Sequence, residues 1–258
     1  MDDFASPESF TANGFVIHPT PVVPTTLLGE VAEHMDAVIA GNYETGIAPG
    51  ERYWNPGDDP DELVKIDFAH LSDRTLTEFV RHPAIGAFAA SLLDAEMVQV
   101  WAAQLLYKPP SSGHSGNVGW HQDENYWREL WEGEVFTVWV AVADVTDDLG
   151  PLLYIQGSNH WGYRPDGNFF SHDLDETRRG VQADGRAWIE VPALLHAGGV
   201  SAHQKFTIHG SAANRGAVAR RGFALHLRTE RSRPVVPSEH VLSQILDNHD
   251  WCPIIYGA

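Results

Sequence analysis

The segment from Gly119 to Trp127 carries residue types that could bind a metal ion. His121 and Asp123 are separated by one position, so on an extended segment their side chains leave the same face and can hold two adjacent coordination sites. His209, much later in the chain, can supply a third ligand. Two histidines and one carboxylate, with open positions opposite them, suit a non-haem Fe(II) oxygenase. The HxD pair alone is weak evidence, because the chain has 14 histidines.

Further motifs accompany this pair in a consistent order. Asn214 and Arg220 follow His209 at five and eleven residues, and upstream lie residues 136–144 (FTVWVAVAD), 150–153 (GPLL) and 157–160 (GSNH). Over residues 60–230 the chain resembles the phytanoyl-CoA dioxygenase family of Fe(II)- and 2-oxoglutarate-dependent oxygenases. The resemblance implies a double-stranded β-helix, which is a cupin-like jelly roll, with Fe(II), 2-oxoglutarate and O2 as cofactor and cosubstrates. It also implies that His121, Asp123 and His209 bind the iron.

Arg220 stands where the family places the arginine that holds the far carboxylate of 2-oxoglutarate. An arginine stays protonated and binds a carboxylate through two parallel hydrogen bonds. Ser211, two residues after His209, can add a hydroxyl hydrogen bond. If residues 220–229 are extended, Arg221 should point to the opposite face. The alternative is that Arg220 is a surface residue.

Three other residues are candidates for the cosubstrate pocket. The family has a tryptophan at the position of Trp139 and a lysine near that of Lys65; the alternatives are a sheet-core aromatic residue and a solvated lysine. Gln104 is a polar residue in an apolar strand, and buried polar groups need partners. The keto acid of the cosubstrate is one candidate partner for Gln104, and another protein group is the other.

Three polar residues near these motifs are left outside the predicted site. Asn214 is expected to shape the turn after the His209 strand. His203 and His226 fall on expected strands, where buried histidines are more often satisfied core residues than ligands, so neither is assigned to the metal.

Aromatic residues near the HxD motif and in a later loop predict a substrate surface. Trp120, Tyr126, Trp127, Phe169 and Phe170 offer flat apolar faces that pack on rings or an aliphatic skeleton. Coenzyme A would require a cluster of basic residues for its phosphates, whereas the chain has 17 basic and 35 acidic residues. We therefore expect a small or medium-sized organic metabolite that is not linked to coenzyme A.

The identity of the ligands favours one reaction type and leaves others open. Family-related halogenases have a small residue at the carboxylate position, so Asp123 favours hydroxylation over halogenation. Epimerisation, desaturation and cyclisation start from the same hydrogen abstraction and remain alternatives. A cupin-like metal enzyme without O2 chemistry and a non-catalytic jelly-roll binding protein are the other classes. Arg220 argues against the first, and the intact ligand set argues against the second.

Composition limits the setting and the partners. A chain of 258 residues fits one domain over residues 1–258. The net charge of −18 argues against nucleic acid and anionic membranes as partners. Cys252 is the single cysteine, which favours a reducing compartment. The acidic start, residues 1–7, is unlike a signal peptide, and no membrane helix is expected. We expect a cytoplasmic monomer or homodimer that acts on a small-molecule substrate.

The hydrophobic pattern changes from helical to strand periodicity near Met97. Helices are predicted from Thr25 or Thr26 to Gly41 and, divided at Pro83, over residues 75–93. Strands are predicted at 97–107, 134–143, 151–156, 187–191, 199–209 and 222–229. Helices followed by many short strands favour a mainly β sandwich or barrel with flanking helices over a doubly wound sheet.

Two segments outside this pattern carry separate expectations. Residues 162–186 form the longest interruption of the strands, and we predict a mobile lid that contributes to substrate choice. The tail from Arg233 is expected to close the domain, with Trp251 and Ile254 docked on its body.

Overall fold

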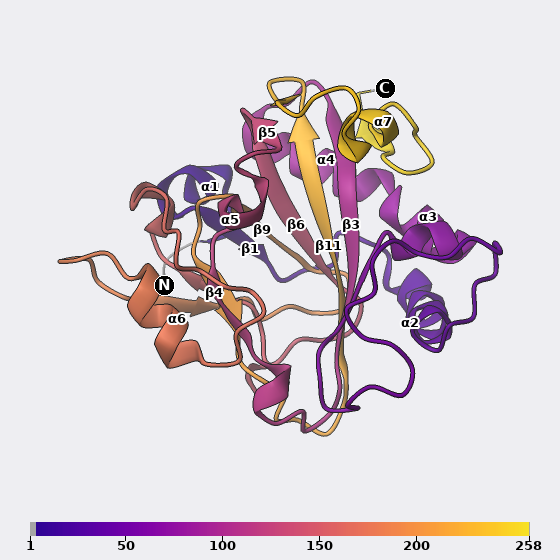
Figure 1. Ribbon diagram of the computed structural model, residues 1–258, viewed down its shortest axis with the longest axis horizontal. Coiled ribbons are helices and arrows are strands. Elements are labelled where there is room, and N and C mark those ends of the chain that lie inside the picture. The colour runs from indigo at the N-terminus through magenta and orange to yellow at the C-terminus, as the bar shows by residue number, and fades with distance from the viewer. Residues whose placement is uncertain (1–3, 258) are drawn as a thin grey trace.

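Two antiparallel β-sheets form the centre of the protein, seen here in a computed structural model that describes residues 4–257 (Figure 1). The larger sheet has the order β1-β9-β6-β11-β3-β13, with β2 also paired to β3. Its strands are β1 (Phe15–His18), β2 (Val64–Asp67), β3 (Val98–Lys108), β6 (Val135–Ala141), β9 (Val200–Gln204), β11 (Arg220–Thr229) and β13 (Ile254–Tyr256). The smaller sheet, ordered β4-β10-β7-β8, contains β4 (Val118–His121), β7 (Leu153–Ile155), β8 (Glu190–Pro192) and β10 (His209–Ser211). A short pair joins β5 (Trp131–Glu132) and β12 (Arg233–Pro234). This architecture confirms the predicted mainly β fold.

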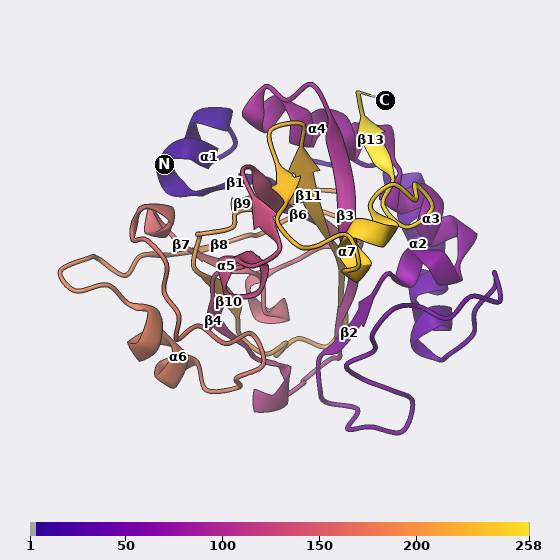
Figure 2. The same cartoon turned by 45° about the horizontal axis from the view of Figure 1, so that its top comes forward.

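Three helices cover the outer face of the larger sheet. They are α2 (Thr25–Ile39), α3 (Arg74–Val80) and α4 (Pro83–Leu93), and their apolar residues share one buried cluster with β3, β6, β9 and β11. Both views show α2 and α3 on one side of the long strands, and β4 and α6 (Leu174–Val181) on the other (Figures 1 and 2). The predicted helix at Thr25 and the division at Pro83 are confirmed. The unpredicted helices are α1 (Pro7–Asn13), α5 (Glu124–Trp127), α6 and α7 (Val241–Ile245).

Alternation along β11 separates an apolar outer face from a polar inner face. Phe223 and Leu225 pack in the cluster under the helices, whereas Arg220 and His226 face the space between the sheets. Arg221 points outward, as predicted, and its guanidinium forms an ion pair with Asp36 of α2 at 2.8 Å.

Apolar side chains close the space between the sheets at both ends. One cluster contains Phe15, Trp139 and Tyr154, and the other contains Trp101 and Trp127 with residues of α7. The C-terminal segment docks as expected, because β13 pairs with β3 and Trp251 lies against Phe68. A cavity of about 470 Å³ remains between these clusters.

Two predicted segments differ from the structure, and one strand was not predicted. The strand predicted at 199–209 is wrong, because β9 ends at Gln204 and β10 begins at His209, with a turn between them. The strand β4 was not predicted at all. The interval 162–186 is not a plain loop, since α6 lies within it and packs on β4. Its predicted mobility stays a prediction.

No helix in residues 4–257 combines the length and the apolar character needed to cross a bilayer. The first three residues of the acidic N-terminal segment lie outside the described residues.

Candidate metal centre

The two predicted histidine ligands lie directly opposite each other on neighbouring strands of the smaller sheet. His121 ends β4 and His209 begins β10, and their Cα atoms are register partners in the antiparallel pair. Directly opposed residues in such a pair have Cβ atoms about 4.5–5.5 Å apart. The ring centroids are 4.2 Å apart, and both residues are buried.

Asp123 reaches the same point by a route that differs from the predicted one. The strand stops at His121, and Asp123 has helical dihedral angles (φ −58°, ψ −30°) at the position preceding α5. The carboxylate Oδ1 lies 3.9 Å from Nε2 of His121 and 3.7 Å from Nε2 of His209. One donor atom from each of the three residues lies within 4.8 Å of the others. The predicted convergence is therefore found, but the extended-segment argument for it was wrong.

Backbone carbonyls fix which nitrogen of each histidine is free. Nδ1 of His121 lies 2.8 Å from the carbonyl oxygen of Gly119, and Nδ1 of His209 lies 3.0 Å from that of Thr207. A carbonyl only accepts hydrogen bonds, so each Nδ1 carries the proton and each Nε2 keeps its lone pair. This arrangement is the one that orients a metal-binding histidine. Burial lowers the pKa of both rings, which favours the neutral form that binds metal.

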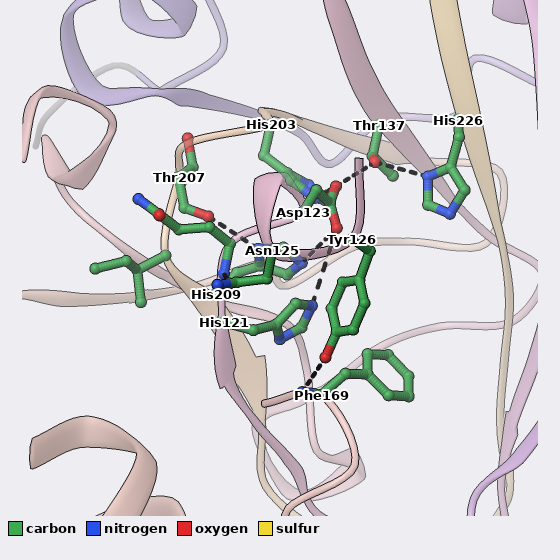
Figure 3. A network of polar contacts seen from close by, with 12 residues as sticks. His121, Asp123, Asn125, Tyr126, Thr137, Phe169, His203, Thr207, His209 and His226 are labelled. Carbon is green, nitrogen blue, oxygen red and sulfur yellow. Dashed lines mark hydrogen bonds and ion pairs between the residues drawn. The ribbon is translucent and has the colours of Figure 1, made fainter. Parts of the chain in front are cut away.

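The second oxygen of Asp123 is held by the larger sheet. Thr137 on β6 donates from its hydroxyl to Oδ2 at 2.7 Å, and Nε2 of His203 on β9 lies 3.1 Å from the same atom (Figure 3). Burial raises the pKa of Asp123, but the hydrogen bond with His203 lowers it, and the pKa lies below its usual value. The carboxylate therefore stays ionised, with Oδ1 directed toward the two free Nε2 atoms.

Gln122, between the predicted ligands His121 and Asp123, connects the surrounding loops. The Gln122 side chain is fully buried and donates to the carbonyls of Gly162 (2.9 Å) and Phe206 (2.7 Å), while its oxygen accepts from the backbone of Arg164 (2.8 Å). Asn125 accepts from the backbone N–H of Gln122 at 2.8 Å. These bonds tie the turn between β4 and α5 to the segments before His209 and after Gly162.

Arg220 lies in the same cavity and has no acidic partner. One terminal nitrogen, Nη1, donates to the carbonyl of Gly150 at 2.6 Å, while the buried Nε has no partner. No Asp or Glu among residues 4–257 forms an ion pair with it. Burial lowers the pKa of Arg220 to about 10, so the side chain is still charged at neutral pH. An unpaired buried cation is unfavourable, which makes this position a fit for a bound carboxylate.

Trp139 on β6 packs beside Arg220 because Gly222, on the neighbouring strand β11, has no side chain. The guanidinium carbon of Arg220 lies 5.3 Å from the Trp139 ring centroid. A Cβ added at Gly222 would come within 2.0 Å of the same ring, so the glycine makes room for it. The buried indole Nε1 of Trp139 has no hydrogen-bond partner. Two orphan donors, Nε of Arg220 and Nε1 of Trp139, thus lie in the predicted cosubstrate pocket.

Sequence reasoning missed Lys108, a second buried cation next to Arg220. Its Nζ lies 2.6 Å from Oγ of Ser211 and also bonds the carbonyl of Ala212. Burial and the nearby arginine lower the pKa of Lys108, but the acceptors around Nζ favour the ammonium form. Because that ammonium donates to Oγ, the Ser211 hydroxyl proton is free to be donated into the cavity that Ser211 lines. The position of Lys108 at the end of an apolar strand was the available signal.

Lys65 and Gln104 line the cavity, but each has a protein partner. Nζ of Lys65 lies 2.7 Å from Asp67 and 3.8 Å from the Tyr53 ring centroid. Gln104 is the register partner of Asp67 and hydrogen-bonds its carboxylate. The solvated-surface alternative for Lys65 is wrong, since this residue is 6% exposed. A role for either residue in binding 2-oxoglutarate stays a prediction.

Four of the five predicted substrate residues line the cavity, namely Tyr126, Trp127, Phe169 and Phe170. The prediction for Trp120 was wrong. Successive residues of a strand point to opposite faces, so Trp120, next to His121, packs against Trp188 on the outer side of the smaller sheet. Aromatic residues distant in sequence complete the wall, and these were not predicted: Tyr53, Phe68, Trp101 and Trp251.

The segment predicted as a lid is tied to the metal centre by backbone hydrogen bonds. The carbonyl of Phe169 accepts from Gly119, and the N–H of Phe169 donates to the Tyr126 hydroxyl at 2.8 Å. The Phe169 ring lies 5.3 Å from that of His121 (Figure 3). Residues of this segment therefore form part of the wall beside His121, one of the predicted metal ligands.

The chain is similar in sequence to known proteins. The sequence model of the family described as Phytanoyl-CoA dioxygenase (PhyH) matches residues 10–222. Phytanoyl-CoA dioxygenase domain-containing protein 1 of Danio rerio is 29% identical over 138 residues, which cover 51% of this chain and 46% of the relative. L-proline trans-4-hydroxylase of Streptomyces griseoviridis is 32% identical over 111 residues, covering 40% of each chain. These matches span less than half the length of either relative.

A solved structure shows the same fold. The epimerase SnoN, in complex with Fe3+, alpha ketoglutarate and nogalamycin RO, superposes with a TM-score of 0.64 at 20% identity. The superposition covers 92% of this chain and 87% of that one. The likeness supports the predicted jelly-roll core.

Proposed function

Because the chain belongs to the phytanoyl-CoA dioxygenase family, we propose that it is an Fe(II)- and 2-oxoglutarate-dependent oxygenase acting on a small or medium-sized organic molecule. One observation carries this proposal. The donor atoms of His121, Asp123 and His209 converge in the same cavity that contains the unpaired guanidinium of Arg220. A metal site and a carboxylate site in one cavity are what a 2-oxoglutarate oxygenase requires.

The metal-binding residues fit Fe(II) by their chemistry. Two neutral imidazoles with free Nε2 atoms and one ionised carboxylate oxygen form the 2-His-1-carboxylate set of non-haem Fe(II) oxygenases. Thr137 and His203 hold the other carboxylate oxygen, which keeps Oδ1 available. When bound, Fe(II) would supply the activation of O2 that couples decarboxylation of 2-oxoglutarate, giving succinate and CO2, to oxidation of the substrate.

The cosubstrate residues fit a dicarboxylate. Arg220 offers unused guanidinium donors, and the Ser211 hydroxyl, fixed by Lys108, offers one more. Charge-assisted hydrogen bonds to a carboxylate are about twice as strong as neutral ones. Trp139 provides a flat wall beside the arginine. We propose that these residues bind the far carboxylate of 2-oxoglutarate, with Lys65 and Gln104 at the edge of the pocket.

The aromatic residues that line the cavity support a ring-containing or apolar substrate. The substrate would pack against Tyr126, Trp127, Phe169 and Phe170, next to the metal-binding histidines. The lysine and arginine side chains that line the cavity are Lys65, which is paired with Asp67, and Arg220. The phosphates of coenzyme A would find no further basic partner there, so the proposed substrate is not a coenzyme A thioester.

Hydroxylation is the outcome that we propose for this substrate. The relative from Streptomyces griseoviridis is named as a hydroxylase, and Asp123 retains the carboxylate at the metal position. Epimerisation, desaturation or cyclisation would use the same residues and differ only in the fate of the substrate after hydrogen abstraction.

The test is succinate formation from 2-oxoglutarate with Fe(II) and O2, measured for the wild-type protein and for His121→Ala, Asp123→Ala and His209→Ala. We expect turnover in the wild type and loss of turnover and of bound iron in each variant, with a retained fold. Stimulation by ring-containing free acids is expected, whereas stimulation by acyl-CoA thioesters alone would contradict the proposed substrate class. Full iron occupancy in any variant would remove that residue from the site.

A further inference from the structure

His226 lies at one end of a row of three polar residues across the inner face of the larger sheet. Thr137 on β6 is the register partner of His203 on β9 and of His226 on β11. His203 and Thr137 both bond Asp123, so their roles belong to the metal centre. Within residues 4–257 His226 is hydrogen-bonded to Thr137 and to none of His121, Asp123 and His209 (Figure 3), and its ring lines the cavity.

The hydrogen bond to Thr137 determines the tautomer of His226. Thr137 has one hydroxyl proton, and it donates this proton in the 2.7 Å hydrogen bond to the ionised carboxylate of Asp123. Nδ1 of His226 lies 2.9 Å from the same hydroxyl oxygen, so Nδ1 must carry a proton and donate it. Burial lowers the pKa of His226 to about 4, so the ring is neutral at physiological pH and its Nε2 carries a lone pair.

Two tryptophans hold this ring in place. The Trp127 ring lies 4.7 Å from the imidazole in an edge arrangement, and the Trp101 ring lies 5.6 Å away. Nε2 points away from Thr137 (Figure 3), and no group of residues 4–257 is hydrogen-bonded to it. Nε2 is open to the cavity, so water or a ligand there can donate a hydrogen bond to it. The aromatic part of the cavity therefore contains a fixed acceptor that the protein itself does not satisfy.

We infer that His226 is a specificity-determining residue whose Nε2 accepts a hydrogen bond from a hydroxyl or N–H group on a ring-containing substrate. The flanking indoles suit the ring, and the single acceptor selects for a donor over an ether or a hydrocarbon at that point. Since Thr137 alone separates His226 from Asp123, this contact would place the donor-bearing side of the substrate toward the metal centre. The conclusion that this ligand is the substrate rests on the proposed function. The existence of the acceptor site does not depend on that function.

The tautomer is tested by nitrogen NMR on the full chain carrying ¹⁵N-labelled histidine, without added iron. Long-range ¹H–¹⁵N spectra distinguish a protonated Nε2 from one with a lone pair, and the His226 signals are those missing in His226→Asn. The asparagine amide can still donate to Thr137 but has no group at the Nε2 position. We expect an unprotonated Nε2 at neutral pH, and a protonated Nε2 would overturn the inference.

Ligand selection is tested with 2-naphthol and its methyl ether, 2-methoxynaphthalene, by calorimetry. We expect 2-naphthol to bind the wild type roughly five- to tenfold more tightly than the ether, because one neutral hydrogen bond contributes about 1 kcal/mol. The preference should vanish in His226→Asn and persist in His226→Gln, whose amide oxygen can occupy the Nε2 position. No binding of 2-naphthol, or an equal loss of preference in both variants, would overturn the proposal. Because neither readout needs iron or 2-oxoglutarate, failure here is distinguishable from failure of the proposed oxygenase activity.

Discussion

Replacing Arg220 with methionine removes the one guanidinium in the cavity while keeping a long apolar side chain. Arg220 uses Nη1 for the carbonyl of Gly150, and its buried Nε has no partner, so donors remain for a bound carboxylate. Each charge-assisted hydrogen bond contributes about 1.5–3 kcal/mol, and removing one member of a buried charge pair costs about 2–5 kcal/mol. We expect a loss of about 3 kcal/mol for 2-oxoglutarate, which corresponds to roughly a 100-fold higher Kd.

The unliganded variant should keep its fold. Loss of the hydrogen bond to Gly150 costs about 1 kcal/mol, and this is offset by removal of a buried charge that has no acidic partner. Iron binding should be unchanged, because Arg220 does not contact the three ligands.

The assay is calorimetric titration of 2-oxoglutarate, combined with thermal unfolding at increasing 2-oxoglutarate. A ligand at 100 times its Kd stabilises a protein by about 2.7 kcal/mol, so the wild type should gain thermal stability at concentrations that leave Arg220→Met unaffected. Arg221→Met is the matched control, since Arg221 lies on the opposite face and pairs with Asp36. A Kd within threefold of wild type for Arg220→Met, or an equal loss in Arg221→Met, would refute the assignment of Arg220.

Three further predictions concern the residues around the site. Gly222→Ala should destabilise the protein by about 1–3 kcal/mol through overpacking and weaken 2-oxoglutarate binding, because the new Cβ would come within 2.0 Å of Trp139. Denaturant unfolding measures the first effect and titration with 2-oxoglutarate the second. An unchanged midpoint of denaturant unfolding would contradict the packing argument. Thr137→Val should lower Fe(II) affinity about 10- to 100-fold, because Oδ2 of Asp123 loses its hydrogen bond. Competition with a chelator measures this affinity. Wild-type affinity in the variant would show that the hydrogen bond does not orient Asp123. Residues 162–186 should exchange their amide hydrogens more slowly when substrate is bound, and identical exchange with and without substrate would exclude a lid.

Local patterns in the sequence predicted the three long central strands of the larger sheet well. The strands β3, β6 and β11 are long and apolar, so their period of two is visible without knowledge of their partners. The helical runs divided at Pro83 were equally clear, because proline at the first helical position marks a helix start. The opposite orientations of Arg220 and Arg221 followed from the alternation of a strand alone.

The smaller sheet was harder to predict because its strands are short and its polar residues are satisfied by distant segments. The strand β4 has four residues, too few for a periodic signal, and the helical conformation of Asp123 depends on the turn that Gln122 ties to Gly162 and Phe206. The error at Trp120 followed from this, since its face is known only once His121 is placed on a strand.

The roles of residues that act through spatial neighbours could not be predicted from the sequence pattern. Lys108 bonds Ser211, which is far along the chain, and His226 owes its tautomer to Thr137 and Asp123. These relations arise from register between strands, which hydrophobic periodicity does not specify. The convergence of His121, Asp123 and His209 could be predicted because the order of their motifs is itself a signal.

The central claim is that one cavity binds Fe(II) through His121, Asp123 and His209 and binds 2-oxoglutarate beside it through Arg220. Anaerobic titration of the iron-free protein with Fe(II) and then 2-oxoglutarate tests this most directly. The wild-type protein should develop the weak metal-to-ligand charge-transfer absorption of 2-oxoglutarate bound to Fe(II), saturating at one equivalent of iron. In Asp123→Ala the band should be absent, and in Arg220→Met it should require roughly 100-fold more 2-oxoglutarate. A wild-type protein that binds neither iron nor 2-oxoglutarate, or that shows no such band when both are bound, would contradict the account.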